Sequence, residues 1–122
     1  MGRPRVAWAE VTIDCRDTKR VATFWAGLLD LPVRAHDDGW FQLGPAIQGG
    51  PVINIQPVSE EKVGKARVHL DLWVDDLGAS IALVERLGGT HTGEAQTVPE
   101  GTNAVMADPE GTEFCVFALR SQ

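Results

Sequence analysis

The sequence has few basic residues, few cysteines and no long apolar segment. Eleven Lys and Arg residues stand against seventeen Asp and Glu residues, so the net charge is −6 at pH 7. Negative charge repels phosphate backbones, and we therefore expect no nucleic-acid partner. No segment approaches the roughly 18 apolar residues of a membrane-spanning helix, and the first residues lack the apolar core of a secretory signal. We expect a cytoplasmic protein without a membrane partner.

The two cysteines, Cys15 and Cys115, are too few for a disulfide framework. The strand patterns described below place their thiols on opposite faces of a sheet, where a disulfide would be difficult to form. The sequence also lacks a phosphate-binding glycine loop and the motifs GxSxG, HExxH and CxxC. With 122 residues, the chain has the size of one compact domain, and we expect a single domain over 1–122.

One pattern occurs twice in the chain. Residues 10–33 (EVTIDCRDTKRVATFWAGLLDLPV) and residues 69–92 (HLDLWVDDLGASIALVERLGGTHT) each begin with alternating polar and apolar residues and continue into a helix-like segment. Superposed without a gap, the two copies pair Glu10 with His69 and Asp17 with Asp76. The aspartates stand where a helix N-cap accepts backbone N–H groups. Apolar residues at helical spacing then follow in each copy: Val21, Phe24, Trp25, Leu28 and Leu29 in the first, and Ile81, Val84 and Leu87 in the second.

Three short strand-like segments, separated by turn residues, follow each predicted helix. They span 33–36, 39–43 and 51–56 in the first half, and 90–97, 102–107 and 113–119 in the second. Each half therefore has the pattern βαβββ. We expect a first module over 5–58, a charged linker over 59–66 and a second module over 67–120. One such module has a sheet face that it cannot bury alone, so the two should pack together in an α+β domain.

The alternation predicts which strand face meets the helices. Val11, Ile13, Cys15, Leu70, Leu72, Val74, Phe114 and Val116 would pack under them. Glu10, Thr12, Asp14, His69, Asp71, Trp73, Glu113 and Cys115 would share the opposite face, and Trp40 and Gln42 alternate in the same way. Trp and Cys seldom lie on a fully solvated face, and aromatic walls with a few polar groups are typical of small-molecule sites. We favour a pocket over a solvated face or a dimer contact.

Three stretches, TIDCRDTKRVATFWAGLLDLPV, RVHLDLWVDDL and VMADPEGTEFCVF, resemble the vicinal oxygen chelate superfamily of glyoxalases, bleomycin-resistance proteins and extradiol dioxygenases, in its glyoxalase-like subgroup. The resemblance implies two tandem βαβββ modules that form one cupped mixed sheet, with helices on the outer face and a ligand or metal in the cup. It also implies a homodimer.

The resemblance further implies metal ligands on the first and last strands of each module. The corresponding positions are Glu10, His69 and Cys115. Metal-dependent relatives have a glutamate at the position of Cys115, and Glu113 lies on the same face as Cys115. In the first module the matching strand offers Asn54 or Gln56. Only one histidine stands at a ligand position, so a two-histidine iron dioxygenase site is not expected. Glu10, His69 and Glu113, or Cys115, could hold zinc, manganese or nickel.

Each of these residues also has a structural interpretation. His69 could simply be hydrogen-bonded to Asp71, Glu10 could be a surface residue or a general base, and Cys115 could be a small apolar residue. Trp40 and Trp73 are the candidates for stacking on an aromatic or cationic ligand. Residues 108–111 (DPEG) form a turn whose charges need no further explanation.

Three functions follow from these patterns. The first is a small-molecule-binding protein that sequesters a ligand or drug without a metal, in a pocket lined by Thr12, Asp14, Trp40, Gln42, Asn54, Gln56, Asp71, Trp73, Glu113 and Cys115. The second is a divalent-metal-dependent lyase or isomerase in which Glu10 and His69 are ligands and catalytic residues. The third is a protein-interaction module whose cup is filled by a partner segment.

Overall fold

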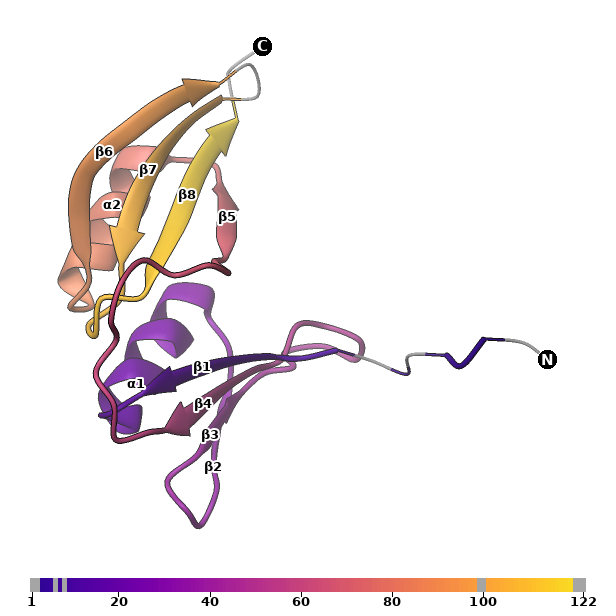
Figure 1. Cartoon of the computed structure of the whole chain (residues 1–122). Coiled ribbons are helices and arrows are strands. Elements are labelled where there is room, and N and C mark those ends of the chain that lie inside the picture. The colour runs from indigo at the N-terminus through magenta and orange to yellow at the C-terminus, as the bar shows by residue number, and fades with distance from the viewer. Residues whose placement is uncertain (1–2, 6, 8, 99–100, 120–122) are drawn as a thin grey trace.

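The computed structural model describes residues 3–5, 7, 9–98 and 101–119, and within them it contains two βαβββ modules (Figure 1). The first module consists of β1 (Val11–Cys15), α1 (Thr18–Leu29), β2 (Val33–Ala35), β3 (Phe41–Leu43) and β4 (Ile53–Pro57). The second consists of β5 (Asp71–Val74), α2 (Leu77–Arg86), β6 (Thr90–Val98), β7 (Gly101–Ala107) and β8 (Glu113–Leu119). The predicted α+β class, element order and tandem repeat are confirmed.

The strands form two four-stranded mixed sheets with the same internal order. These orders are β1-β4-β3-β2 and β5-β8-β7-β6; the first pair in each sheet is parallel and the others are antiparallel. The expected cup is therefore divided between two hydrogen-bonded sheets, since β1 and β5 are edge strands that do not pair with each other in the described residues. Aromatic side chains join the modules instead: the Trp25 ring of α1 packs against the Phe114 ring of β8, with centroids 4.8 Å apart.

Both predicted helix N-caps are present. The Asp17 carboxylate accepts a hydrogen bond from the Arg20 N–H, and that of Asp76 accepts one from the Ala79 N–H. After α2 the chain turns through Gly88, which has a φ of +102°, and then through Gly89. A Cβ at Gly89 would lie 2.7 Å from the Ala107 carbonyl oxygen, so glycine allows this turn to pack closely against β7.

The core is continuous across both modules and contains the residues that alternation predicted for the helix-facing side of the strands. Ile13, Cys15, Phe114 and Val116 are buried together with α1 and α2 residues. Leu70, Leu72 and Val74 are only partly buried against this core. Val11, also predicted to be buried, is 39% exposed, because it is the first residue of an edge strand.

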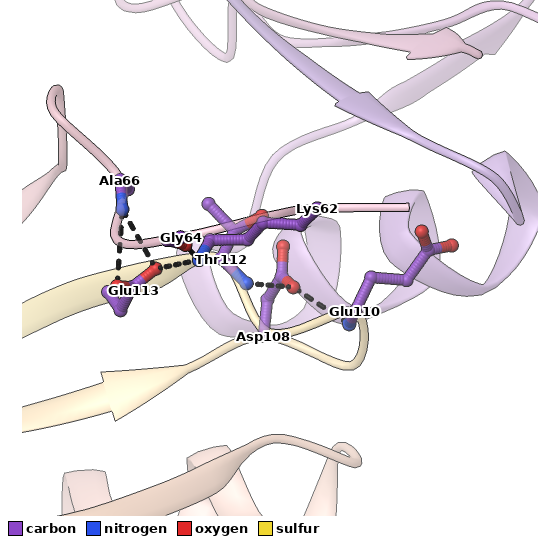
Figure 2. Close-up of polar contacts among 7 residues, drawn as sticks. All are labelled: Lys62, Gly64, Ala66, Asp108, Glu110, Thr112 and Glu113. Atoms are coloured by element: carbon purple, nitrogen blue, oxygen red, sulfur yellow. Dashed lines mark hydrogen bonds and ion pairs between the residues drawn. The ribbon is translucent and has the colours of Figure 1, made fainter. Parts of the chain in front are cut away.

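The turn over residues 108–111 has a structural function that the sequence interpretation missed. Asp108 is 2% exposed, and its Oδ2 accepts a hydrogen bond from Trp25 Nε1 at 3.0 Å. Its Oδ1 accepts hydrogen bonds from the backbone N–H groups of Glu110 and Thr112 (Figure 2). The Glu110 carboxylate accepts hydrogen bonds from the backbone N–H groups of Arg16 and Asp17 in the first module. The charges of this turn therefore hold the two modules together.

Candidate functional site

The face of the second sheet that points away from α2 carries the main polar and aromatic cluster. Strand register places Asp71 beside Cys115 and Trp73 beside Phe117 across the β5–β8 pair. A hollow of about 300 Å³ lies on this face and is lined by Lys65, His69, Asp71, Asn103, Val105, Glu113, Cys115 and Phe117, among others. We call it the second-module hollow. Asp71, Glu113 and Cys115, all predicted pocket residues, line it together with His69.

His69, Asp71 and Cys115 bring three different donor atoms close together. His69 Nδ1 lies 3.0 Å from Asp71 Oδ1. One side-chain donor atom from each of the three residues lies within 4.8 Å of the other two. A nitrogen, an oxygen and a sulfur donor are thus assembled on one surface of paired strands.

Neither cysteine thiol is activated. Burial raises the pKa of the Cys115 thiol, and the Asp71 carboxylate raises it further, although a hydrogen bond from Asn103 acts in the opposite direction. Burial, with the carboxylates of Glu110 and Asp108, raises the pKa of Cys15 to about 12. Both cysteines are free. Cys115 is therefore a protonated thiol in this site and a poor nucleophile at neutral pH.

Glu113 is held by the segment between the modules. Lys62 Nζ forms an ion pair with Glu113 Oε1 at 2.7 Å, and the Ala66 N–H donates to both carboxylate oxygens at 3.2 Å (Figure 2). The hydrogen bond from Lys62 is the largest influence on this carboxyl and lowers the pKa of Glu113. The Glu113 carboxylate thus already has two partners within the chain. The pairing of Lys62 with Glu113 was not predicted from the sequence, because the two residues are far apart in the chain and the segment around Lys62 has no periodic pattern.

Trp73 and Phe117 form an aromatic pair beside the hollow. Their rings are stacked, with centroids 4.6 Å apart and planes 22° from parallel. The Trp73 residue is 53% exposed, so its ring can be reached from solvent. Phe117 follows Cys115 at strand spacing, and extending the predicted alternation by one step would have placed it on this face.

The predicted site residues of the first module mostly contact other residues of the same module. Glu10 Oε1 accepts a hydrogen bond from Asn54 Nδ2 at 2.9 Å, and Gln42 Nε2 donates to the Gly44 carbonyl oxygen. Gln56 lies opposite Asp14 in the β1–β4 register, and Trp40 is half-buried just before β3.

Thr12 and Asp14 line a separate cleft of about 170 Å³ between the modules, which His69 and Glu113 also border. Among the described residues, Glu10 and Glu113 do not join a cluster of three metal-binding donors with His69. The ligand set of Glu10, His69 and Glu113, with Cys115 as the alternative to Glu113, is therefore not brought together around one point in this conformation.

No helix in the described part of the chain has the length and apolar character needed to cross a bilayer.

Comparison with known proteins relates the chain to one family and one fold. The model of the glyoxalase-like domain family matches residues 10–117. No curated protein matches the sequence. A glyoxalase/bleomycin resistance protein/dioxygenase family enzyme from Burkholderia phytofirmans PsJN superposes with a TM-score of 0.75 at 16% identity, covering 91% of this chain and 97% of that one.

Two fosfomycin resistance proteins are also similar in structure. FosX from Listeria monocytogenes gives a TM-score of 0.74 at 12% identity, with 96% of both chains covered. FosX from Mesorhizobium loti gives 0.70 at 16% identity, covering 93% of this chain and 92% of that one. At such identities the similarity concerns the fold, because one fold carries many activities.

Proposed function

The chain belongs to the glyoxalase-like family of the vicinal oxygen chelate superfamily, and from this premise we propose that it binds a small aromatic cation at the second-module hollow. The observation that carries the proposal is the accessible Trp73 ring, stacked on Phe117 at the edge of a hollow that also contains Asp71. A ring and a carboxylate on one face are the two groups that recognise such a ligand.

The charge around the hollow supports a cationic ligand. Glu113 is already paired with Lys62, whereas the Asp71 carboxylate is about half exposed and lies 3.0 Å from Nδ1 of the His69 ring. Asp71 and Trp73 are two residues apart on one strand, so their side chains stand about 7 Å apart on the same face. A cationic group beside Asp71 therefore leaves the attached ring within reach of Trp73.

A metal-dependent lyase or isomerase built on Glu10, His69 and Glu113 has less support, because Asn54 and Lys62 engage the two carboxylates. The homodimer implied by the resemblance stays a prediction, which sedimentation equilibrium tests.

Benzamidine and its neutral analogue benzamide test the proposal. We expect benzamidine to shift the Trp73 indole N–H resonance, identified by its loss in Trp73→Phe, and to leave that of buried Trp25 in place. A cation over an exposed ring and near a carboxylate contributes about 1 kcal/mol, so benzamidine should bind about fivefold more tightly than benzamide. The titrations are made with a chelator present.

Two variants of equal charge provide the control. Asp71→Asn should abolish the preference for benzamidine, whereas Glu85→Gln, on α2, should preserve it. A Trp73 resonance that neither probe moves would contradict the proposal. So would an equal preference in the two variants.

A further inference from the structure

A lysine reaches the second-module hollow from the segment between the modules, residues 59–66. This residue, Lys65, lines the hollow. Glu113 fixes the backbone on both sides of it, because the Glu113 carboxylate pairs with Lys62 at 2.7 Å and accepts hydrogen bonds from the Ala66 N–H at 3.2 Å (Figure 2). A basic side chain from a segment without regular structure is thereby held at the edge of a polar site.

The hollow contains two opposite charges that do not pair with each other. Lys65 and Asp71 both line it, yet they form no ion pair with each other in the part of the chain that the structure describes. Both charges act on the Cys115 sulfur: burial raises the pKa of this thiol, the Asp71 carboxylate raises it further, and the Lys65 ammonium lowers it. The other carboxylate of the hollow, Glu113, is balanced by Lys62. A ligand in the hollow therefore meets one cation and one anion, which favours a zwitterion.

Strand register determines the order of these groups along the hollow. Asp71 lies beside Cys115 in the parallel β5–β8 pair, and Trp73 follows Asp71 on the same face of β5. Glu113, which holds the segment around Lys65, precedes Cys115 on β8 and so lies at the opposite end from Trp73. The order along the hollow is therefore a lysine, an aspartate and an accessible aromatic ring.

Building on the proposed function, we propose that the ligand of the second-module hollow is an aromatic α-amino acid. Its ring stacks on Trp73, its ammonium faces Asp71 and its carboxylate faces Lys65. In such a molecule the ring and the carboxylate lie on either side of the carbon that carries the ammonium, so its three groups occur in the same order as their partners.

The size of the hollow and the nature of the lysine side chain agree with this ligand class. A hollow of about 300 Å³ lies at the lower end of the range for ligand pockets, which fits a molecule with one side-chain ring. Lys65 is exposed, and the flexible four-carbon stem of a lysine lets its ammonium follow the carboxylate of the ligand.

Three probes separate the contributions of the ammonium and the carboxylate. L-Phenylalanine has both groups, 2-phenylethylamine lacks the carboxylate, and 3-phenylpropionate lacks the ammonium. Binding to the full chain is followed by the Trp73 indole N–H resonance at pH 7. We expect L-phenylalanine to bind about threefold more tightly than 2-phenylethylamine, the effect of one exposed ion pair. It should also bind more tightly than 3-phenylpropionate, because it alone pairs with both Lys65 and Asp71.

Two lysine variants provide the control. Lys65→Met should abolish the preference for L-phenylalanine over 2-phenylethylamine. Lys19→Met should preserve it, because Lys19 is an exposed residue of α1 that does not line the hollow. Circular dichroism verifies that each variant is folded.

The possible failures of this inference and of the proposed function differ. Equal affinities for L-phenylalanine and 2-phenylethylamine in the wild type, or a preference that persists in Lys65→Met, would overturn the amino-acid assignment alone. So would 3-phenylpropionate binding as tightly as L-phenylalanine. The proposed function needs only the ring and the cation, so it is overturned together with this inference when none of the three probes moves the Trp73 resonance.

Discussion

At the scale of single residues, the two thiols differ in what surrounds them. Cys15 is 3% exposed within the core, and its pKa is raised to about 12. Cys115 is partly exposed at the hollow, and burial and Asp71 raise its pKa as well. Since the thiolate is the reactive form, both cysteines should react slowly, and accessibility should decide between them.

We therefore expect a disulfide reagent such as Ellman's reagent to label one thiol of the native protein at pH 8. That thiol should be Cys115, and it should react more slowly than free cysteine. Guanidinium should expose both. Rapid labelling of native Cys115→Ser, in which Cys15 alone remains, would contradict this assignment.

At the scale of elements, the segment between the modules is bound to Glu113, the first residue of β8. Lys62 pairs with Glu113, and the Ala66 N–H donates to the same carboxylate. The Lys62 ammonium also donates to the Gly64 carbonyl oxygen, which folds the segment back on itself (Figure 2). A segment without regular structure is thereby attached to the sheet.

This ion pair should make stability depend on pH in one direction. The folded state lowers the pKa of Glu113, so its contribution is present above the ordinary pKa of a glutamate and is lost as the pH falls through the lower folded value. We expect Glu113→Gln to lower the free energy of unfolding by about 1 kcal/mol at pH 7. Urea denaturation should show little difference between the two proteins at pH 2.

Lys62→Met provides the second half of this test. It should reproduce the loss at pH 7, because either substitution removes the pair. A difference between wild type and Glu113→Gln that is equally large at both pH values would show that the carboxylate contributes by some means other than its charge.

At the scale of the whole molecule, the modules are joined by a hydrophobic contact and a buried carboxylate. Phe24 and Trp25 of α1 pack against Phe114 of β8, and Asp108 accepts the Trp25 indole N–H at the same place. Each half of the chain thus supplies side chains to a core that neither half encloses alone.

Removal of this carboxylate should weaken the whole domain. Asp108→Ala leaves the N–H groups of Trp25, Glu110 and Thr112 without their acceptor. The bond from Trp25 is the buried one, and a buried hydrogen bond to a charged group contributes roughly 1.5–3 kcal/mol. We expect the free energy of unfolding to fall by about 3 kcal/mol in urea denaturation. Asp108→Asn keeps one acceptor oxygen and should lose less. Equal, small losses in both variants would mean that water replaces these hydrogen bonds.

Local sequence patterns determined the elements and the faces of the strands. Alternation requires neighbouring side chains to lie on opposite faces, so His69, Asp71, Cys115 and Glu113 could be assigned to one surface. Apolar spacing and an acidic N-cap likewise predicted both helices. These features depend on residues close in the chain, and the repeat of the pattern gave the fold class.

The tertiary structure alone decided which of these residues meet. Strand register placed Asp71 beside Cys115, and the segment between the modules brought Lys62 to Glu113. Glu113 therefore forms an ion pair, although it shares its face with Asp71 and Cys115. The same holds for Asp108, because one of the donors to its buried carboxylate, the Trp25 indole N–H, comes from the other module. Contacts between distant segments depend on how the two modules pack. The periodicity of a single strand or helix carries no information about which distant residue it will meet.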